Sequence, residues 1–173
     1  MEEIVEVEEL EPIDNPVFDY YDLPSKTARL GTPKSKKIKV IFLDIDGVLN
    51  TNSDRNISDE KLIFLSELVS KTGAEIVLSS SWRNWRNHPK LNTTDSFITK
   101  WKLQFSNNYV VINKILEPEM PKTTAIEKYL TEYKPEKYVV LDDQVVFGTN
   151  LIQTNSDFGL TKEDCKKAAQ LLK

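Results

Sequence analysis

Two aspartates, Asp44 and Asp46, follow an apolar run of the chain with a single isoleucine between them. An apolar run that ends at a turn signal predicts a buried strand, and side chains two residues apart in a strand point the same way. The two carboxylates therefore lie close together, where their charges repel unless a shared proton or a divalent cation offsets them. The alternative is a structural turn, in which Gly47 has positive φ and the aspartates bond to the backbone. We favour the chemical interpretation.

Hydroxyl, amino and carboxylate groups occur at three further points of the chain. One apolar run ends at Ser79 and Ser80, another ends at Asp142 and Asp143, and Lys122 follows a proline at the start of a predicted helix. Oxygen ligands favour Mg²⁺ over zinc or copper. A hydroxyl, a lysine and the amides of a helix N-terminus beside such a cation suit a phosphate.

The elements that must position these groups alternate between strands and helices. Apolar runs bounded by turn signals predict strands, and apolar residues at helical spacing predict helices. Ser58 and Gly73 are the expected caps of the first helix, and Thr161 with Asp164 approximates a capping box at the start of the last. The expected strands are 38–43, 75–79, 109–112, 138–141 and 151–154, and the expected helices are 58–71, 95–106, 122–132 and one that begins at Thr161.

This alternation predicts a parallel sheet in an α/β fold. Such sheets carry their binding sites beyond the carboxyl ends of the strands. The candidate groups lie at such ends, so we expect them to converge on one edge of the sheet. The chain has no Gly-rich nucleotide-binding fingerprint and contains only five glycines.

The order of these motifs resembles the haloacid dehalogenase (HAD) superfamily. The resemblance rests on an Asp-x-Asp-Gly-Val-Leu motif, an apolar strand that ends in serine, a lysine at a helix start and an apolar strand that ends in Asp-Asp. The segments IVLSSSWR and VVLDDQ look most like the small HAD domains related to Swiss Army Knife RNA-repair proteins. The resemblance implies a Rossmann-like three-layer sandwich with a mainly parallel central sheet.

The resemblance also implies a role for each matching residue. Asp44 matches the nucleophile that forms an aspartyl-phosphate, and Asp46 matches the general acid and base. Ser79 matches the phosphate-binding hydroxyl, with Ser80 as the competing candidate. A lysine balances the charge, and Lys122 suits this role better than Lys114, which sits less well at a helix start. The implied ligands of Mg²⁺ are Asp44, Asp46, Asp142 and Asp143.

The spacing of the motifs bears on the substrate of the implied Mg²⁺-dependent phosphomonoester hydrolase. Only 32 residues separate Asp46 from Ser79 and 42 separate Ser79 from Lys122, which leaves no room for a cap domain. An open site favours a phosphorylated macromolecule as the partner. We slightly favour a phosphoprotein, including phosphotyrosine, because the body of the chain is not basic; the alternative is the 3′ or 5′ phosphorylated end of a nucleic acid.

A cluster of aromatic and basic residues follows Ser81, and its member Arg83 is a further candidate for substrate binding. Such a cluster can stack on bases and neutralise phosphates, grip a phosphotyrosine ring, or pack the first turn of a helix. Two other classes of function remain. A phosphate-binding module without turnover is disfavoured by the Asp44 and Asp46 pair, and the sequence does not separate a hydrolase from a phosphotransferase.

The chain divides into an arm, 1–37, which lacks a sustained period, and a HAD-like catalytic domain, 38–173, and charge is unevenly distributed along it. Residues 1–25 carry nine acids and no base, residues 26–39 carry six bases and no acid, and the remainder has 17 bases and 18 acids. The arm is polar and rich in proline, which predicts an extended or partly disordered segment. The formal net charge of −4 therefore describes the arm more than the body.

Several features bear on the compartment. No apolar stretch approaches the roughly 18 residues that a membrane span needs, and the acidic N-terminus differs from a secretory signal. The one cysteine, Cys165, excludes an intramolecular disulfide and is typical of a reducing compartment. We therefore expect a cytoplasmic protein without a membrane span, and a monomer is compatible with the sequence.

Overall fold

The computed structural model describes residues 37–87, 111–146, 148 and 150–173 of the chain. The expected arm, apart from its last residue, and the expected helix 95–106 lie outside these residues. The described strands are β1 (Lys39–Leu43), β2 (Glu75–Leu78), β3 (Ile112–Ile115), β4 (Lys137–Asp142) and β5 (Leu151–Gln153). The helices are α1 (Asp59–Thr72), α3 (Lys122–Tyr133) and α4 (Lys162–Leu171), with a 3₁₀ helix, η1 (Ser81–Asn87).

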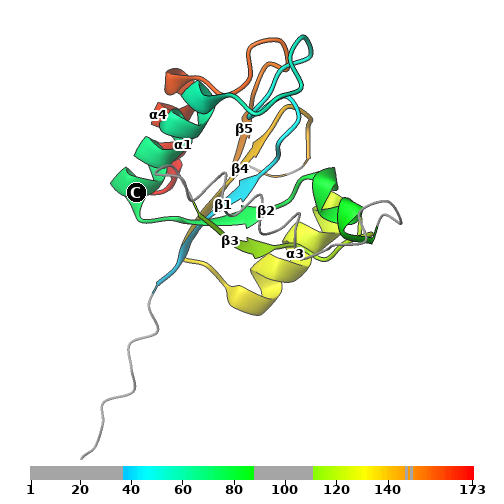
Figure 1. The fold of residues 1–173 in the computed structure, drawn as a ribbon. Helices are drawn as coiled ribbons and strands as arrows, with labels where there is room; N and C mark the ends of the chain where they lie inside the picture. Colours follow the sequence, from blue (N-terminus) through cyan, green and yellow to red (C-terminus); the bar gives the residue numbers. More distant parts are fainter. Residues whose placement is uncertain (1–36, 88–110, 147, 149) are drawn as a thin grey trace, which may run out of the picture. The chain divides into compact units, whose positions relative to one another are not determined.

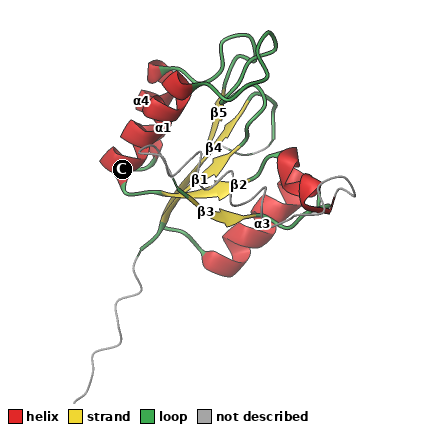
Figure 2. Ribbon diagram, in the orientation of Figure 1, coloured by secondary structure: helices red, strands yellow, loops and turns green. Residues whose placement is uncertain are grey.

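The five strands form one sheet in the order β3-β2-β1-β4-β5, and each neighbouring pair is parallel (Figures 1 and 2). The predicted parallel sheet is therefore confirmed. Between Asp46 and Ser79 the chain forms only a loop, α1 and β2, so no cap domain is inserted there. None of the described helices is long and apolar enough to cross a membrane.

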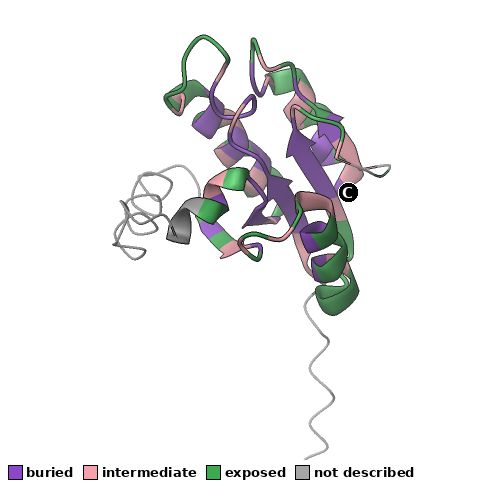
Figure 3. Cartoon of the chain, turned by 90° about the vertical axis from the view of Figure 1, so that its right-hand side faces the viewer, coloured by how far each residue is buried: buried purple, intermediate pink, exposed green. Residues whose placement is uncertain are grey.

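Side chains of β1 alternate between two apolar layers, because successive strand residues point to opposite faces. Ile41 and Leu43 pack in the layer that also contains buried residues of α1 and α4, which lie side by side. Val40 and Phe42 pack against α3, where the Phe42 ring meets the edge of Tyr129 at a centroid distance of 5.3 Å. The central strands are buried on both sides (Figure 3), which gives a three-layer α/β sandwich.

The helix caps follow the sequence signals with one difference. Gly73 ends α1 in the left-handed conformation, at φ 67°, and its N–H donates to the Val69 carbonyl. Thr161 and Asp164 form the predicted capping box at the start of α4. Ser58 occupies the N-cap position of α1, but its side chain makes no capping hydrogen bond.

The third strand extends further along the chain than predicted. The expected range was 109–112, of which 109 and 110 lie outside the described residues; residue 111 is not in the strand, and β3 spans Ile112–Ile115. Pairing with β2 fixes β3, and the pairing shifts register between Ile76 and Val77. At this irregularity the Asn113 side chain accepts a hydrogen bond from the Ile76 N–H, at 2.8 Å. The apolar content of the segment therefore located the strand only approximately.

Candidate active site

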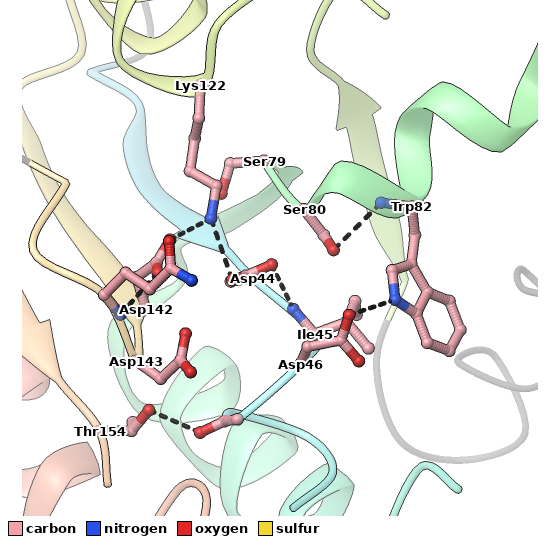
Figure 4. Close-up of polar contacts among 12 residues, drawn as sticks. Asp44, Ile45, Asp46, Ser79, Ser80, Trp82, Lys122, Asp142, Asp143 and Thr154 are labelled. Carbon is pink, nitrogen blue, oxygen red and sulfur yellow. Dashed lines mark hydrogen bonds and ion pairs between the residues drawn. The ribbon is translucent and has the colours of Figure 1, made fainter. Parts of the chain in front are cut away.

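The register of the central strands brings the candidate residues to one level of the sheet. β1 pairs in register with β2 and β4 as far as its last residue, Leu43. Beyond it, the Asp44 N–H donates to the Leu141 carbonyl and the Ser79 N–H donates to the Leu43 carbonyl, each at 2.9 Å. Asp142 follows Leu141 at the end of β4, so three strands deliver their polar residues side by side (Figure 4).

Three carboxylates converge at this level. One oxygen from each of Asp44, Asp142 and Asp143 lies within 4.8 Å of the others. Asp44 is 6% exposed and Asp142 is fully buried, so water screens their charges poorly. Burial, and then the negative charge of Asp44, raises the pKa of Asp142 to about 6. The same two causes raise the pKa of Asp143. The group therefore favours a bound proton or cation.

Lys122, the first residue of α3, supplies a positive charge to this group. Its Nζ donates to Asp44 Oδ2 at 2.9 Å and to Asp142 Oδ2 at 2.5 Å (Figure 4). Burial alone would lower the pKa of the ammonium, but the charge of Asp44 and the hydrogen bonds to both acids raise it. Lys114, the rival candidate, lies instead over the ring of Tyr133, 3.5 Å from its centroid.

The residues around the three acids fit a divalent cation such as Mg²⁺. Three carboxylates of this kind are typical ligands for a hard cation. The turn after β1 also leaves space for them, since Gly47 has φ 72° and a Cβ there would lie 2.5 Å from Asp143 Oδ2. Thr154 holds this turn, because its hydroxyl donates to the Gly47 carbonyl at 2.7 Å. A side chain at Gly47 would displace a candidate ligand.

The two candidate serines differ in their hydrogen bonds. Among the side chains that the structure describes, Ser79 Oγ is a buried polar atom without a hydrogen-bond partner. Ser80 Oγ accepts a bond from the Trp82 N–H at 3.3 Å. A buried hydroxyl without a partner costs free energy in the folded protein, and a phosphate oxygen would satisfy it. The structure therefore favours Ser79 over Ser80 as the phosphate-binding hydroxyl.

Asp46 lies apart from the other acids, although the prediction included it among the metal ligands. Its Oδ2 accepts a hydrogen bond from Trp82 Nε1 at 2.7 Å, and its Oδ1 accepts one from Asn50 Nδ2 at 2.9 Å. Arg55 approaches Oδ1 at 3.6 Å. The carboxylate is thus held by side chains other than the acids, and this position does not support metal binding through it. Its 36% exposure leaves it accessible to substrate and water.

Arg83 also differs from the prediction, which made it a substrate-binding residue. The side chain is buried, and its guanidinium donates to the backbone carbonyls of Ser79, Ser80, Glu117 and Met120. These bonds tie the end of β2 and η1 to the loop that leads into α3. Four of its five N–H groups are thereby engaged, so its position supports a structural role in place of phosphate binding.

The sequence interpretation missed residues that hold the site. Asn50 is 1% exposed; its Oδ1 accepts from the Gly47 N–H at 2.9 Å, and its amide donates to Asp46. An asparagine that directly follows the aspartate motif was an available signal. No such signal marks Thr154, because this residue lies 107 residues from Gly47, whose carbonyl it contacts. The aromatic residues after Ser81, which include Trp82, were expected only to stack or pack.

A family model described as "HAD domain in Swiss Army Knife RNA repair proteins" matches residues 40–165. A comparison with curated proteins finds no match. The matched range contains the strands β2 to β5 and all of β1 except Lys39, and their parallel sheet agrees with the Rossmann-like α/β fold that the resemblance implied. A HAD domain implies a hydrolase of the phosphatase type, and its three clustered acids can hold a metal ion. The chain therefore belongs to the HAD superfamily, in the family of HAD domains of Swiss Army Knife RNA repair proteins.

Proposed function

We propose that this protein is a Mg²⁺-dependent phosphomonoester hydrolase in which Asp44 becomes phosphorylated during the reaction. The observation that carries the proposal is the position of the Asp44 carboxylate. It lies in one group with Asp142 and Asp143 and bonds to the ammonium of Lys122. The same edge of the sheet carries the hydroxyl of Ser79, which has no hydrogen-bond partner among the described residues. A phosphate there would meet a nucleophile, a hydrogen-bond donor and a positive charge.

In the first step, a carboxylate oxygen of Asp44 attacks phosphorus, and the bond from phosphorus to the leaving oxygen breaks. The carboxyl group of Asp46 gives its proton to the leaving oxygen. Lys122 orients Asp44 through the hydrogen bond at 2.9 Å, and its charge stabilises the phosphoryl oxygens. The products of this step are an aspartyl-phosphate and an alcohol.

In the second step, the Asp46 carboxylate takes a proton from water, and the water oxygen attacks the phosphorus of the aspartyl-phosphate. The bond between phosphorus and Asp44 breaks, which releases inorganic phosphate and restores the carboxylate. Mg²⁺ held by Asp44, Asp142 and Asp143 would offset negative charge on the carboxylates and on the phosphoryl group. Splitting one displacement into two lowers the barrier of each.

Release of phosphate from p-nitrophenyl phosphate tests this proposal. We expect release to require added Mg²⁺ and to stop with EDTA. Asp44→Asn should reduce it to background, because an amide is not a nucleophile for phosphorus. Asp59→Asn is the matched control, since Asp59 is an exposed residue in the first turn of α1. Phosphate binding without turnover by the wild type would contradict the proposal and support a binding module.

Two features of the chain bear on the proposed substrate class. Only a loop and two regular elements lie between Asp46 and Ser79, which supports an open site on that side. The matching family is named for RNA repair proteins, which favours the phosphorylated end of a nucleic acid over the phosphoprotein that the near-neutral body slightly favoured. Trp82 and Arg83 do not decide between them, because they contact Asp46 and backbone carbonyls.

A substrate panel compares the two classes. It contains RNA and DNA oligonucleotides with 3′ or 5′ phosphates, and phosphotyrosine and phosphoserine peptides, each assayed with and without Mg²⁺. We expect the highest kcat/KM for an oligonucleotide end, and we expect that affinity to weaken with salt because phosphate contacts release counterions. A higher kcat/KM for a phosphopeptide would support the alternative. Transfer of phosphate to an added alcohol would identify a phosphotransferase.

A further inference from the structure

The Asp46 carboxylate is held at both oxygens by side-chain N–H groups from two different segments. Trp82 Nε1, in η1, donates to Oδ2 at 2.7 Å (Figure 4), and Asn50 Nδ2, in the loop after β1, donates to Oδ1 at 2.9 Å. The nearby Arg55 is 68% exposed and lies 3.6 Å from Oδ1, and exposed ion pairs of this kind contribute little. The two N–H donors therefore determine where this carboxylate lies.

Trp82 is a rigid donor. Its side chain packs against the apolar layer of α1 and α4, and its backbone N–H donates to Ser80 Oγ at 3.3 Å. An indole has one N–H, which donates and cannot accept. A packed ring with a single fixed donor imposes one position on the carboxylate that it contacts. Neither contact serves the metal group, which contains Asp44, Asp142 and Asp143.

We propose that Trp82 is a positioning residue for Asp46, and that its indole N–H holds the carboxyl group at the leaving-oxygen side of the site, apart from the metal-binding acids. This inference rests on the proposed function, because it requires Asp46 to exchange a proton with the leaving oxygen. Trp82 itself neither supplies nor receives that proton. A protonated carboxyl group keeps acceptor lone pairs, so the indole can hold Asp46 before and after the transfer.

The position of Asp46 matters most when the leaving oxygen is strongly basic. An alkyl phosphate would release an alkoxide unless Asp46 protonates it, whereas p-nitrophenolate is a weak base that leaves without a proton. Loss of a well-placed general acid should therefore slow departure of the leaving group from an alkyl phosphate more than from p-nitrophenyl phosphate. Loss of a residue that only stabilises the fold would slow the reactions of both substrates equally.

Trp82→Phe removes the N–H and keeps an aromatic ring in the same place. We expect kcat/KM for glycerol 2-phosphate to fall about tenfold or more, since small displacements of catalytic groups are costly. With p-nitrophenyl phosphate, kcat/KM should stay within about threefold, because it reports only the steps up to departure of the leaving group, and p-nitrophenolate leaves without a proton. The value of kcat is not compared, because it also includes the attack of water on the aspartyl-phosphate, which Asp46 assists with either substrate. In an Asp46→Asn background, Trp82→Phe should have no further effect, because both changes disrupt one function.

The inference would be overturned if Trp82→Phe lowered kcat/KM equally with both substrates. It would also be overturned if Trp82→Phe lowered kcat/KM for glycerol 2-phosphate as much in the Asp46→Asn background as in the wild type. The Asp44→Asn and Mg²⁺ experiments test the proposed function separately, because they do not depend on Trp82.

A second measurement remains informative if Trp82→Phe does not fold. The indole ¹H–¹⁵N resonance of Trp82, assigned by elimination with W85F and W101F, should move in Asp46→Ala and stay in Asp59→Ala. An unmoved resonance in Asp46→Ala would also overturn it.

Discussion

Single residues of the site should make different contributions to folding and to the proposed phosphate binding. Lys122 bonds to two buried acids, so its charge stabilises the folded protein as well as any bound phosphate. The Ser79 hydroxyl forms no hydrogen bond with the described residues. Thr154 has a hydroxyl that is bonded to the Gly47 carbonyl, at 2.7 Å. Substitutions at the two hydroxyl groups can therefore separate binding from stability.

Ser79→Ala should weaken phosphate binding and leave the fold intact. A hydrogen bond to a charged group contributes about 1.5–3 kcal/mol, so kcat/KM for p-nitrophenyl phosphate should fall roughly tenfold to a hundredfold. The free energy of unfolding should stay the same or rise, because the substitution removes no hydrogen bond between described residues. Thr154→Val is the contrasting variant and should lose about 1–2 kcal/mol of stability. A strongly destabilised Ser79→Ala variant with normal kcat/KM would contradict this assignment.

The raised pKa of Asp142 should make stability depend on pH. The folded protein holds this proton up to a pH of about 6, whereas the ordinary value for an aspartate is 3.8. Between these values the folded state binds more protons than the unfolded chain, so the free energy of unfolding decreases as the pH rises. Asp142→Asn does not titrate and should show a smaller decrease. Urea unfolding from pH 4 to 7 in the presence of EDTA measures the free energy of unfolding of the wild type and of Asp142→Asn. An equal decrease with pH in the two proteins would refute the assignment.

At the scale of elements, the site depends on the turns that follow the strands. β1, β2 and β4 are in register, and this places their ends together. The turn after β1 then determines where the acids lie, because Gly47 packs against Asp143 and bonds to Asn50 and Thr154. Gly73, at the end of α1, has a similar φ but has open space around it.

Gly47→Ala should therefore lower the stability of the protein more than Gly73→Ala does. Both substitutions place an alanine at positive φ, which costs about 1–2 kcal/mol. At Gly73 this should be the whole effect, because no described residue apart from its chain neighbours has an atom within 4 Å of the added Cβ. At Gly47 the Cβ would also meet Asp143 Oδ2 at 2.5 Å, so the acid must move and Mg²⁺ affinity should fall. Calorimetric Mg²⁺ titration of both variants checks this; equal affinities would show that Asp143 is not a ligand.

At the scale of the whole molecule, the acidic group joins parts of the chain that are far apart in sequence. Asp44 follows β1, Asp142 ends β4 and Lys122 begins α3. A cation bound by the acids would bind only the folded protein, because the unfolded chain does not bring them together. Binding should thus stabilise the entire sheet.

Mg²⁺ should accordingly raise the melting temperature. At a concentration of 100 times Kd, the gain in unfolding free energy is about 2.7 kcal/mol. Asp143→Asn should reduce this gain while leaving the stability without Mg²⁺ unchanged or higher, because burial and Asp44 already raise the pKa of Asp143. Asp59→Asn should keep the full gain. A melting temperature that does not respond to Mg²⁺ would argue against the metal site.

The sequence predicted the elements better than the contacts between them. Apolar runs and cap residues located β1, β2, β4, β5 and three helices, because burial and capping leave local patterns. The β3 boundaries were wrong because pairing with β2 fixes them. The convergence of Asp44 with Asp142 followed from strand ends in a parallel sheet. The hydrogen bonds of Arg83 could not be predicted from the sequence, because side-chain hydrogen bonds to distant carbonyls leave no local pattern.

The backbone bonds that align the site have a consequence for local opening. The amides of Asp44 and Ser79 donate to carbonyls of adjacent central strands, next to residues that are fully buried. Such amides exchange with deuterium only when the strands separate, which in the centre of a sheet requires global unfolding. The backbone at Asp44, the proposed nucleophile, and at Ser79, the proposed phosphate-binding residue, should therefore resist local unfolding. Any substitution that destabilises the sheet should reduce the fraction of active molecules in proportion to the unfolded population, while leaving the activity of each folded molecule unchanged.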